Sequence, residues 1–370
     1  MKILEVTNVD FSLRHFLLPL MRELRASGHE VVGVCADGPL LADVRAEGFR
    51  VEVAPMARSF SPLAQFRAFI SLVRLIRRER PDIVHAHMPI SGLLARFAAR
   101  LCGVPQIAYT CHGFLFNQPG SWARRTLALV LEWLAGHITN IYLTVSQEEA
   151  ADARRLHINP RAQAIGNGRD PEQFRPDDAA RRRIRTAMYV PDERVVIVAV
   201  SRLVRHKGYP ELLAAIEHVP DAELWIVGDR LSSDHGATLE PVFERGREQL
   251  GSRLHFLGYC TDVPAVLAAA DIFTLPSHFE GLPMSIIEAM LTGLPVVATD
   301  IRGPREQVVA EKTGLLVPPG TILPLARALE RLVQDTDLRH RMGHAGRIRA
   351  EHLFNERTIL RRTVKLLTSL

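Results

Sequence analysis

Residues 271–305 constrain the fold of the chain more than any other stretch. They read DIFTLPSHFEGLPMSIIEAMLTGLPVVATDIRGPR. An apolar run at 272–275 predicts a strand, a run with helical period follows over about 283–291, and a second apolar run at 296–299 predicts another strand after a Gly-Leu-Pro break. A strand–helix–strand unit of this kind is the building block of a parallel sheet, so we expect the chain to contain one.

Two glutamates in this stretch occupy positions where ligands of open α/β sheets bind. Glu280 is predicted on the loop at the carboxyl end of the first strand, and Glu288 lies one to two turns into the helix. A carboxylate at the second position could accept hydrogen bonds from ribose hydroxyls. Taken singly, each glutamate is equally well explained as an ordinary charged residue of a loop or helix, so the prediction rests on the whole stretch.

The backbone between the two glutamates predicts an anion site. The first turn of a helix presents N–H groups that lack intrahelical partners, and such groups bind phosphate. Here they belong to Leu282, Met284 and Ser285, beside Gly281 in the loop, whereas Pro283 has no N–H and suits a first turn. The stretch therefore predicts a ligand that contains phosphate.

The spacing Glu280-(seven residues)-Glu288, inside HFEGLPMSIIEAMLTGLPVVATD, resembles the E-x7-E signature of retaining glycosyltransferases of family 4, which have the GT-B fold. The resemblance implies an α/β protein with two Rossmann-like parallel-sheet domains that face an interdomain cleft. It implies an acceptor-side domain at 1–175, completed by a C-terminal helix at 354–370. Residues 176–353 would bind the nucleotide-sugar donor.

Bulk properties agree with a soluble globular protein of two domains. The chain has 370 residues, of which 47% are hydrophobic and 24% charged, and it has no apolar run near the ~18 residues of a membrane span. The N-terminus enters a strand directly, without the apolar core of a signal peptide, so we expect a cytoplasmic protein. The four cysteines are scattered, which argues against a zinc site or a disulfide framework. The net charge of +5 suits an anionic partner, but the sequence has no recognised nucleic-acid-binding motif.

Strands and helices alternate along the first half of the chain, as in a parallel sheet that is covered on both faces. Strands are predicted at 2–7, 30–35, 51–54, 82–86, 106–110 and 141–145, and helices at 13–27, 39–47, 62–79, 90–102, 121–136 and 147–157. The first strand-to-helix turn has no glycine before Gly28, so a dinucleotide-binding G-x-G-x-x-G loop is excluded there. Asn8 and Asp10 in this turn either face the acceptor or hold the turn through their side chains.

Histidines follow two strands of the first half. His112, in the segment TCHGF, resembles the family's histidine that contacts the donor sugar and phosphate region. His85 and His87, in VHAHMP, are predicted as structural or pocket-lining residues, because no third metal ligand is evident in the sequence.

The second half carries candidate donor-binding residues. Two glycines and two prolines in AIGNGRDPEQFRPDD predict a loop, which resembles the family's interdomain segment and places Asn167 at the cleft floor. Arg202 and Lys207 follow the predicted strand 194–201 and resemble the family's pair of cations that bind the donor pyrophosphate. Tyr259 and Asp262, after strand 253–258, resemble the position that holds the nucleotide base.

Two basic segments, 57–80 and 114–133, interleave aromatic residues with arginines. Such a segment can lie on an anionic membrane surface. It can equally form a helix that covers a sheet with its apolar side and exposes its arginines to solvent. Family members that use lipid-linked acceptors have similar segments in their first domains.

The resemblance implies sugar transfer from a nucleotide diphosphate, expected to be a UDP-sugar, to a hydroxyl of a lipid-linked or polysaccharide-precursor acceptor. Glu280, His112, Arg202 and Lys207 would act in catalysis, and no cofactor, metal or protein partner is expected. The D-x-D at 335–337 lies between helical segments and reads as a turn or a helix cap. The alternatives are a GT-B UDP-sugar epimerase and a non-catalytic sugar- or lipid-binding protein.

Overall fold

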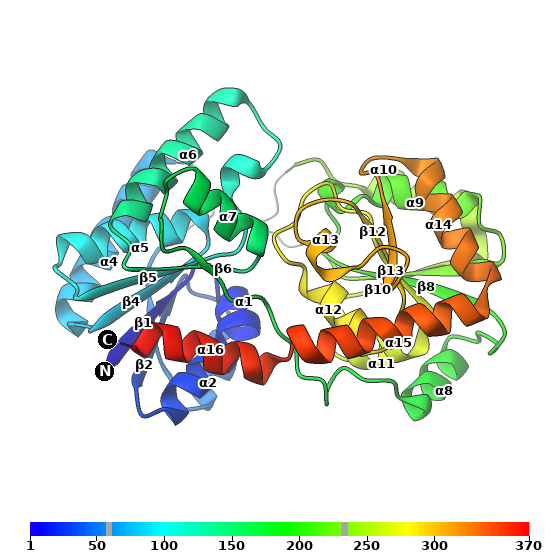
Figure 1. Cartoon of the computed structure of the whole chain (residues 1–370), viewed down its shortest axis with the longest axis horizontal. Coiled ribbons are helices and arrows are strands. Elements are labelled where there is room, and N and C mark those ends of the chain that lie inside the picture. Colours follow the sequence, from blue (N-terminus) through cyan, green and yellow to red (C-terminus); the bar gives the residue numbers. More distant parts are fainter. Residues whose placement is uncertain (57–60, 231–235, 370) are drawn as a thin grey trace. The chain divides into compact units, whose positions relative to one another are not determined.

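The computed structural model describes residues 1–56, 61–230 and 236–369, which form two compact units. The first unit consists of Met1–Gly166 with Thr358–Leu370, and the second of Asn167–Arg357 (Figure 1). The predicted boundary lay near Arg175, a few residues beyond this division. Each unit is an α/β fold around its own parallel sheet, so the predicted fold class is confirmed.

The described part of the first unit holds a seven-stranded sheet with the strand order β3-β2-β1-β4-β5-β6-β7, and every pair of neighbours is parallel. The strands are β1 (Lys2–Val6), β2 (Glu30–Cys35), β3 (Arg50–Val53), β4 (Ile83–His87), β5 (Gln106–Cys111), β6 (Ile141–Thr144) and β7 (Gln163–Ala164). All six strands predicted for this half are present, and the two-residue β7 was not predicted.

Helices cover both faces of this sheet (Figure 1). One face packs on α4 (Pro62–Glu79) and α5 (Pro89–Leu101), and the other on α2 (Leu18–Ala26) and the end of α16 (Glu356–Thr368), through Val364 and Leu367. The remaining elements are α1 (Asp10–Ser12), α3 (Leu41–Ala46), the 3₁₀ turn η2 (Leu115–Asn117), α6 (Trp122–His137) and α7 (Gln147–Arg155). Ser146 caps α7, since its Oγ accepts a hydrogen bond from the Glu149 N–H at 3.1 Å.

The helix predicted over 13–27 is not continuous. A π-helical turn, η1 (Leu13–Leu17), separates α1 from α2. Pro19 lies at the start of α2, where it has no N–H to donate to the preceding turn and its ring would crowd the carbonyl four residues earlier. The wider turn of a π-helix accommodates such a break.

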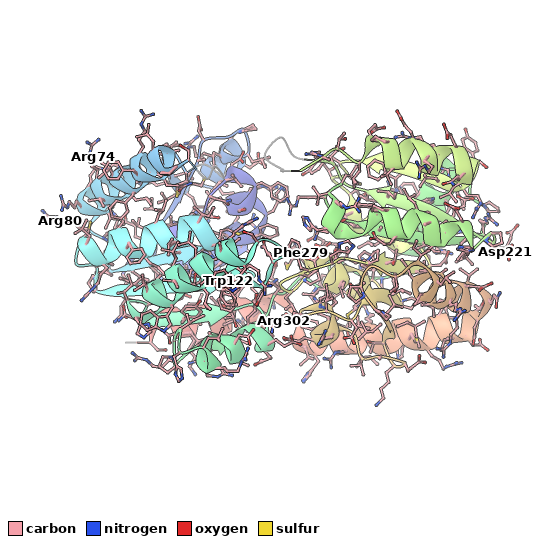
Figure 2. The ribbon with its side chains drawn as sticks, turned by 90° about the horizontal axis from the view of Figure 1, so that it is seen from above. Arg74, Arg80, Trp122, Asp221, Phe279 and Arg302 are labelled. Carbon is pink, nitrogen blue, oxygen red and sulfur yellow. The ribbon has the colours of Figure 1, made fainter. Side chains whose placement is uncertain are left out.

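The basic segment 57–80 begins outside the described residues, because 57–60 are not described. Its remainder forms α4, which ends at Arg80 in a left-handed conformation with φ 47°. Arg74 and Arg80 reach outward from this helix and its end (Figure 2). Leu72 and Ile76 are buried against the sheet, so α4 is a sheet-covering helix with exposed arginines on its other side.

A buried ion pair ties α6 to α5. Arg96 is fully buried and donates from Nη1 and Nη2 to the two carboxylate oxygens of Glu132 at 2.8 and 2.9 Å. The Tyr142 hydroxyl donates to Glu132 Oε1 at 2.6 Å, and the Arg96 guanidinium lies 3.8 Å from the centre of the Tyr109 ring. Burial acts to lower the pKa of Arg96, but the charge and hydrogen bonds of Glu132 raise it above its ordinary value.

The second unit holds a six-stranded parallel sheet in its described residues, with the strand order β10-β9-β8-β11-β12-β13. The strands are β8 (Val195–Val200), β9 (Ala222–Val227), β10 (Leu254–Gly258), β11 (Ile272–Leu275), β12 (Val296–Thr299) and β13 (Gly314–Val317). The helices include α8 (Asp178–Ala187), α9 (Tyr209–Glu217), α10 (Glu240–Leu250), α11 (Val263–Ala269), α12 (Met284–Leu291), α13 (Pro304–Gln307), α14 (Ile322–Gln334) and α15 (Thr336–Leu353). The D-x-D caps a helix as predicted, since Asp335 Oδ1 accepts from the Leu338 N–H at 2.8 Å.

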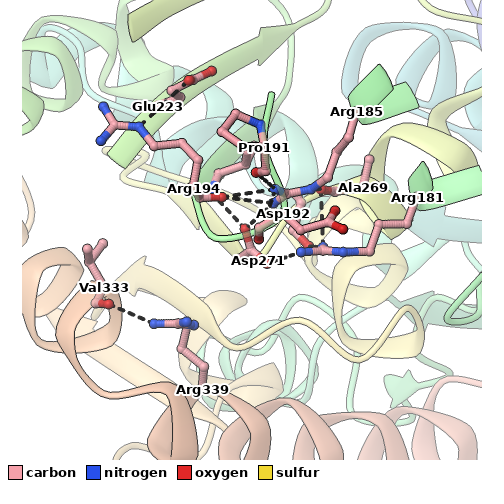
Figure 3. A network of polar contacts seen from close by, with 12 residues as sticks. Arg181, Arg185, Pro191, Asp192, Arg194, Glu223, Ala269, Asp271, Val333 and Arg339 are labelled. Carbon is pink, nitrogen blue, oxygen red and sulfur yellow. Dashed lines mark hydrogen bonds and ion pairs between the residues drawn. The ribbon is translucent and has the colours of Figure 1, made fainter. Parts of the chain in front are cut away.

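Asp271, at the start of β11, is the centre of a polar network (Figure 3). Its carboxylate accepts hydrogen bonds from Arg181 at 2.8 Å, Arg185 at 2.5 Å and the Val196 N–H at 2.8 Å. The buried Arg185 also donates to the carbonyl groups of Ala269 and others nearby. The network joins α8 to the first residues of β8 and β11, and so holds the two strands whose far ends carry the candidate site.

Candidate functional site

The loops that follow β8 and β11 bring two predicted residues together. These strands are neighbours, with Ile272 paired to Ile197, so their carboxyl ends meet at one edge of the sheet. Lys207 Nζ lies 2.5 Å from Glu280 Oε1, and Ser277 Oγ donates to the same oxygen at 2.6 Å. The side chains of Lys207 and Glu280 are only 13% and 10% exposed, so this ion pair is largely removed from water.

Two glycines allow the backbone of these loops to approach closely. Gly208 has φ 79°, and a β-carbon there would collide with the carbonyl oxygen of Pro276. Gly303 has φ 84°, and a β-carbon there would collide with the carbonyl oxygen of Gly281. Only glycine combines this φ with the close approach, so both positions define the path of the Glu280 loop.

The helix α12 starts where the sequence predicts an anion site. The helix begins at Met284 after Pro283, and its N-cap makes no side-chain hydrogen bond within the described chain. The carbonyl of Leu282 accepts from Asn167 Nδ2 at 2.7 Å, and that of Pro283 from Gln307 Nε2 at 2.9 Å. Asn167 thus holds the loop before α12, a role for which the sequence offered no signal.

Glu288 lies one turn into α12 and is 8% exposed. Its Oε1 accepts a hydrogen bond from Arg169 Nε at 2.6 Å. Arg169 is held in turn by backbone hydrogen bonds, from its N–H to the Phe354 carbonyl and from the Glu356 N–H to its own carbonyl. We did not predict Arg169, although a cation in the segment GNGRD is a weak signal that could have drawn attention to it.

Of the other predicted donor-side residues, Arg202 lies on the same loop as Lys207, whereas Tyr259 and Asp262 lie on the loop after β10. Arg202 is half-buried directly after β8. Tyr259 is 54% exposed, and its N–H donates to Asp229 Oδ2 at 3.0 Å. Asp262 caps α11, where it accepts from the Ala265 N–H at 3.3 Å, and it pairs with Arg183 at 3.2 Å. The described contacts of Asp262 are those of a helix cap, and a role in base binding stays a prediction.

In the first unit, four titratable side chains form a chain of contacts. Glu5 is fully buried on β1, and its Oε1 lies 3.0 Å from His85 Nδ1. Glu5 Oε2 lies 2.8 Å from His87 Nε2, and His87 Nδ1 lies 3.2 Å from Nε2 of the half-buried His112. Two predicted pocket-lining histidines are therefore connected to the predicted catalytic histidine.

Burial and mutual charge set the protonation of these groups. Burial acts to raise the pKa of Glu5, but the charge of His85 and hydrogen bonds from both histidines lower it to about 2. Burial and the charge of His85 lower the pKa of His87 to about 4, against the opposing effect of Glu5. Burial, with the charges of His87 and His85, lowers the pKa of His112 to about 3. At neutral pH Glu5 is ionised, and His87 and His112 are neutral.

Among the described residues, Glu5, His85 and His87 form a group that could hold a metal ion. Their possible ligand atoms lie within 4.8 Å of one another. Both carboxylate oxygens of Glu5 are, however, at hydrogen-bond distance from an imidazole nitrogen. His85 Nε2 lies 2.8 Å from Thr110 Oγ1, and His87 Nδ1 contacts His112. All four imidazole nitrogens thus have protein partners, and the geometry is that of a hydrogen-bonded network.

The turn after β1 is held by side chains. Asp10 Oδ1 accepts from the Phe11 N–H at 2.8 Å, and Oδ2 accepts from the Leu40 N–H at 3.1 Å. Asn8 Oδ1 is 3.5 Å from Ser12 Oγ. The backbone carbonyl of Asn8 accepts a hydrogen bond from the Ala36 N–H. Of the two alternatives for Asn8 and Asp10, these contacts favour the one in which they hold the turn.

Comparison with known proteins agrees with this architecture. The profile of the family described as "Glycosyl transferases group 1" matches residues 180–349, and that of "Glycosyl transferase 4-like domain" matches residues 13–168. The UDP-Gal:alpha-D-GlcNAc-diphosphoundecaprenol alpha-1,3-galactosyltransferase of Escherichia coli is 31% identical over 315 residues, which are 82% of this chain and 79% of that protein. A putative glycosyltransferase of Bacillus subtilis, EpsD, is 31% identical over 97% of this chain and 94% of its own.

Solved structures show the same fold. Anabaena Alr3699/HepE, in complex with UDP and glucose, superimposes with a TM-score of 0.85 at 23% identity and full coverage of both chains. Sucrose-phosphate synthase from Thermosynechococcus elongatus gives a TM-score of 0.84 at 21% identity and covers 99% of this chain and 98% of its own.

The chain belongs to the group 1 glycosyltransferases with a family 4-like first domain, and its relatives include bacterial enzymes of capsular polysaccharide and lipopolysaccharide core synthesis. The predicted family and the GT-B fold are confirmed. None of the helices in the described parts of the chain is both long and apolar enough to cross a membrane.

Proposed function

We propose that the protein transfers a sugar from a UDP-sugar to a hydroxyl of a lipid-linked acceptor, with retention of configuration and without a metal ion. The observation that carries this proposal is the Lys207–Glu280 ion pair beside the start of α12, which gathers cationic and N–H groups where a diphosphate would bind. The E. coli relative supports the choice of donor and acceptor, because its name states UDP-Gal and a diphosphoundecaprenol-linked sugar.

In this mechanism the bond between the anomeric carbon and the diphosphate oxygen breaks as the acceptor oxygen bonds to the same face of that carbon. Arg202, Lys207 and the N–H groups at the start of α12 stabilise the negative charge that develops on the leaving diphosphate. The leaving phosphate oxygen takes the proton of the acceptor hydroxyl, so no protein base is required. The cations of Arg202 and Lys207 supply the positive charge that a metal ion supplies in other transferases.

The two glutamates then have distinct tasks. The described side-chain contacts of Glu280 are both to Oε1, from Lys207 and Ser277, so Oε2 is the oxygen that accepts from a hydroxyl of the donor sugar. Arg169 binds Oε1 of Glu288, so Oε2 accepts from a ribose hydroxyl. In both cases the cation orients the carboxylate.

Calorimetry in EDTA tests the donor assignment. We expect UDP to bind without metal, and Glu288→Ala to weaken UDP binding by about ten- to a hundredfold, because hydrogen bonds to a charged oxygen are lost. Glu248→Ala, which removes an exposed glutamate from α10, is the control and should bind UDP like the wild type.

Tighter binding of GDP or ADP would agree with the family but indicate a different donor nucleotide, as in the GDP-mannose-dependent relative from Mycolicibacterium smegmatis. Binding of NAD alone, or of no nucleotide, would contradict the proposal. Consumption of UDP-sugar without an acceptor would favour an epimerase.

We also propose that α6 places the acceptor side of the protein on an anionic lipid surface. Several large apolar side chains of α6 are exposed to solvent, whereas its opposite side is anchored through Glu132. The exposed apolar residues are Trp122, Leu127, Val130, Trp133 and Leu134, with exposed fractions from 42% to 81%. Arg124 and Arg125 lie beside them and suit anionic headgroups.

Vesicle sedimentation tests the lipid contact. We expect the wild type to bind vesicles of phosphatidylglycerol and phosphatidylethanolamine, and the double variant Trp122→Ser/Trp133→Ser to bind at least tenfold more weakly, because each buried indole contributes roughly 1.5–3 kcal/mol. Tyr189→Ser removes another exposed aromatic ring, 94% exposed in the second unit, and should bind like the wild type. Equal binding by all three proteins would exclude α6 as the contact.

A further inference from the structure

Five polar side chains lie on one face of three adjacent strands in the first unit. Glu5 on β1 pairs in register with His85 on β4, and His87 on β4 pairs with Thr110 on β5. Residues two apart on a strand share a face, so His87 joins His85, and His112 continues beyond Thr110. The same face buries apolar residues against α2 and the end of α16, so a buried carboxylate here requires hydrogen-bond partners.

The directions of the hydrogen bonds in this network can be assigned from Glu5. An ionised carboxylate only accepts, so the hydrogen bonds of 3.0 and 2.8 Å come from N–H groups at Nδ1 of His85 and Nε2 of His87. A neutral His87 with its proton on Nε2 has a lone pair on Nδ1. This lone pair faces His112 Nε2 at 3.2 Å, so that nitrogen must donate.

The same reasoning determines the free nitrogen of His112. The lowered pKa values of His87 and His112 mean that each ring carries one proton at neutral pH. The single proton of His112 lies on Nε2, toward His87, so its Nδ1 carries a lone pair. Such a nitrogen accepts a hydrogen bond from a hydroxyl but repels the oxygens of a phosphate, which only accept.

We propose that Glu5 and His87 are positioning residues, which hold His112 in the tautomer with an unprotonated Nδ1 so that it accepts a hydrogen bond from a sugar hydroxyl. This inference rests on the proposed function, because a sugar is the expected ligand. It narrows the predicted role of His112, which covered both the sugar and the phosphate region, to the sugar alone.

Nuclear magnetic resonance of the full chain labelled with ¹⁵N-histidine tests the tautomer without any substrate. Two-bond ¹H–¹⁵N correlations distinguish the two neutral tautomers, and loss of a signal in His112→Gln identifies the His112 ring among the 15 histidines. We expect His87 and His112 to be protonated at Nε2 alone. In Glu5→Gln, the amide can donate to His87 as well as accept, so the single Nε2–H form of His112 should be lost.

Thr110→Val is the matched control. It removes the hydroxyl 2.8 Å from His85 Nε2, on the branch of the network that leads away from His112. Both variants alter a buried hydrogen bond of the network, but the His112 signal should change only in Glu5→Gln. With a UDP-sugar donor, Glu5→Gln should lower kcat about tenfold with KM for the donor nearly unchanged, and Thr110→Val should retain both values.

Several outcomes would overturn the inference. An Nδ1–H tautomer of His112 in the wild type, or an unchanged tautomer in Glu5→Gln, would contradict the assigned hydrogen bonds. A stoichiometric divalent metal that is lost in Glu5→Gln would show that the three residues ligate an ion instead. If the tautomers are as expected but no UDP-sugar is bound or turned over, the proposed function is contradicted, and so is the hydrogen bond from a sugar hydroxyl to His112. The assigned tautomer of His112 would still hold.

Discussion

Lys207→Ala should lower the turnover number by about a hundred- to a thousandfold while leaving the fold intact. Lys207 is the cation that the loop after β8 brings to Glu280. Removal of one preorganised group that stabilises developing charge costs roughly 3–4 kcal/mol in the transition state, which corresponds to that loss of rate. Steady-state kinetics with a UDP-sugar and acceptor measure the change, and circular dichroism and thermal unfolding show whether the fold is retained.

Arg205→Ala provides the matched control for this prediction. Arg205 lies on the same 3₁₀ turn, η3 (Arg205–Lys207), but it is exposed. Its loss changes the net charge by the same amount, so a general electrostatic effect would slow both variants equally. Turnover by Lys207→Ala within a few-fold of the wild type would remove Lys207 from the catalytic machinery.

Glu132→Ala should destabilise the first unit by about 3–5 kcal/mol, because it leaves the guanidinium of Arg96 buried without its counter-charge. The loss should be concentrated where Glu132 holds α6 against α5. Denaturant unfolding measures the free energy, and hydrogen exchange of the peptides that span α6 locates it. Unchanged protection of α6 would show that its attachment depends on apolar packing instead.

The triple variant Arg96→Met/Glu132→Leu/Tyr142→Phe separates the charge from the shape. It replaces the ion pair and the hydroxyl that donates to it by apolar groups of similar size. Replacing a whole buried polar cluster often costs little, whereas breaking it costs much. We therefore expect the triple variant to be more stable than Glu132→Ala.

The sequence predicts the regular elements well because their signals are local. The bounds of α4 and β2 match the predicted 62–79 and 30–35, since Pro62 marks the first turn of α4 and a continuous apolar run marks β2. The π-turn before Pro19 was missed, because the apolar period continues through it and only the proline gives a local sign. The strand β7 has only two residues, which are too few to show a period.

The side-chain partners of the site are harder to predict. Glu5 and His85 are 80 residues apart in sequence, and their contact depends on the order and register of the strands as well as on their presence. Arg169 and Glu288 meet across 119 residues, from a loop that has no periodic pattern. The resemblance to a known family predicted Glu280 and Lys207 as site residues from their motifs. Arg169 lies in the segment that resembles the family's interdomain loop, but nothing in that segment indicated its contact with Glu288.

Every described side-chain contact of Lys207, Glu280 and Glu288 is made with residues between Asn167 and Arg357. The second unit therefore contains both the predicted donor-binding residues and their contact partners. In evolutionary terms, such a unit can be inherited whole while the other half of the chain diversifies, so that one way of activating a sugar serves many different acceptors. For protein engineering, the junction at Gly166–Asn167, with the return of the chain at Arg357–Thr358, is the place to exchange one half for that of a relative.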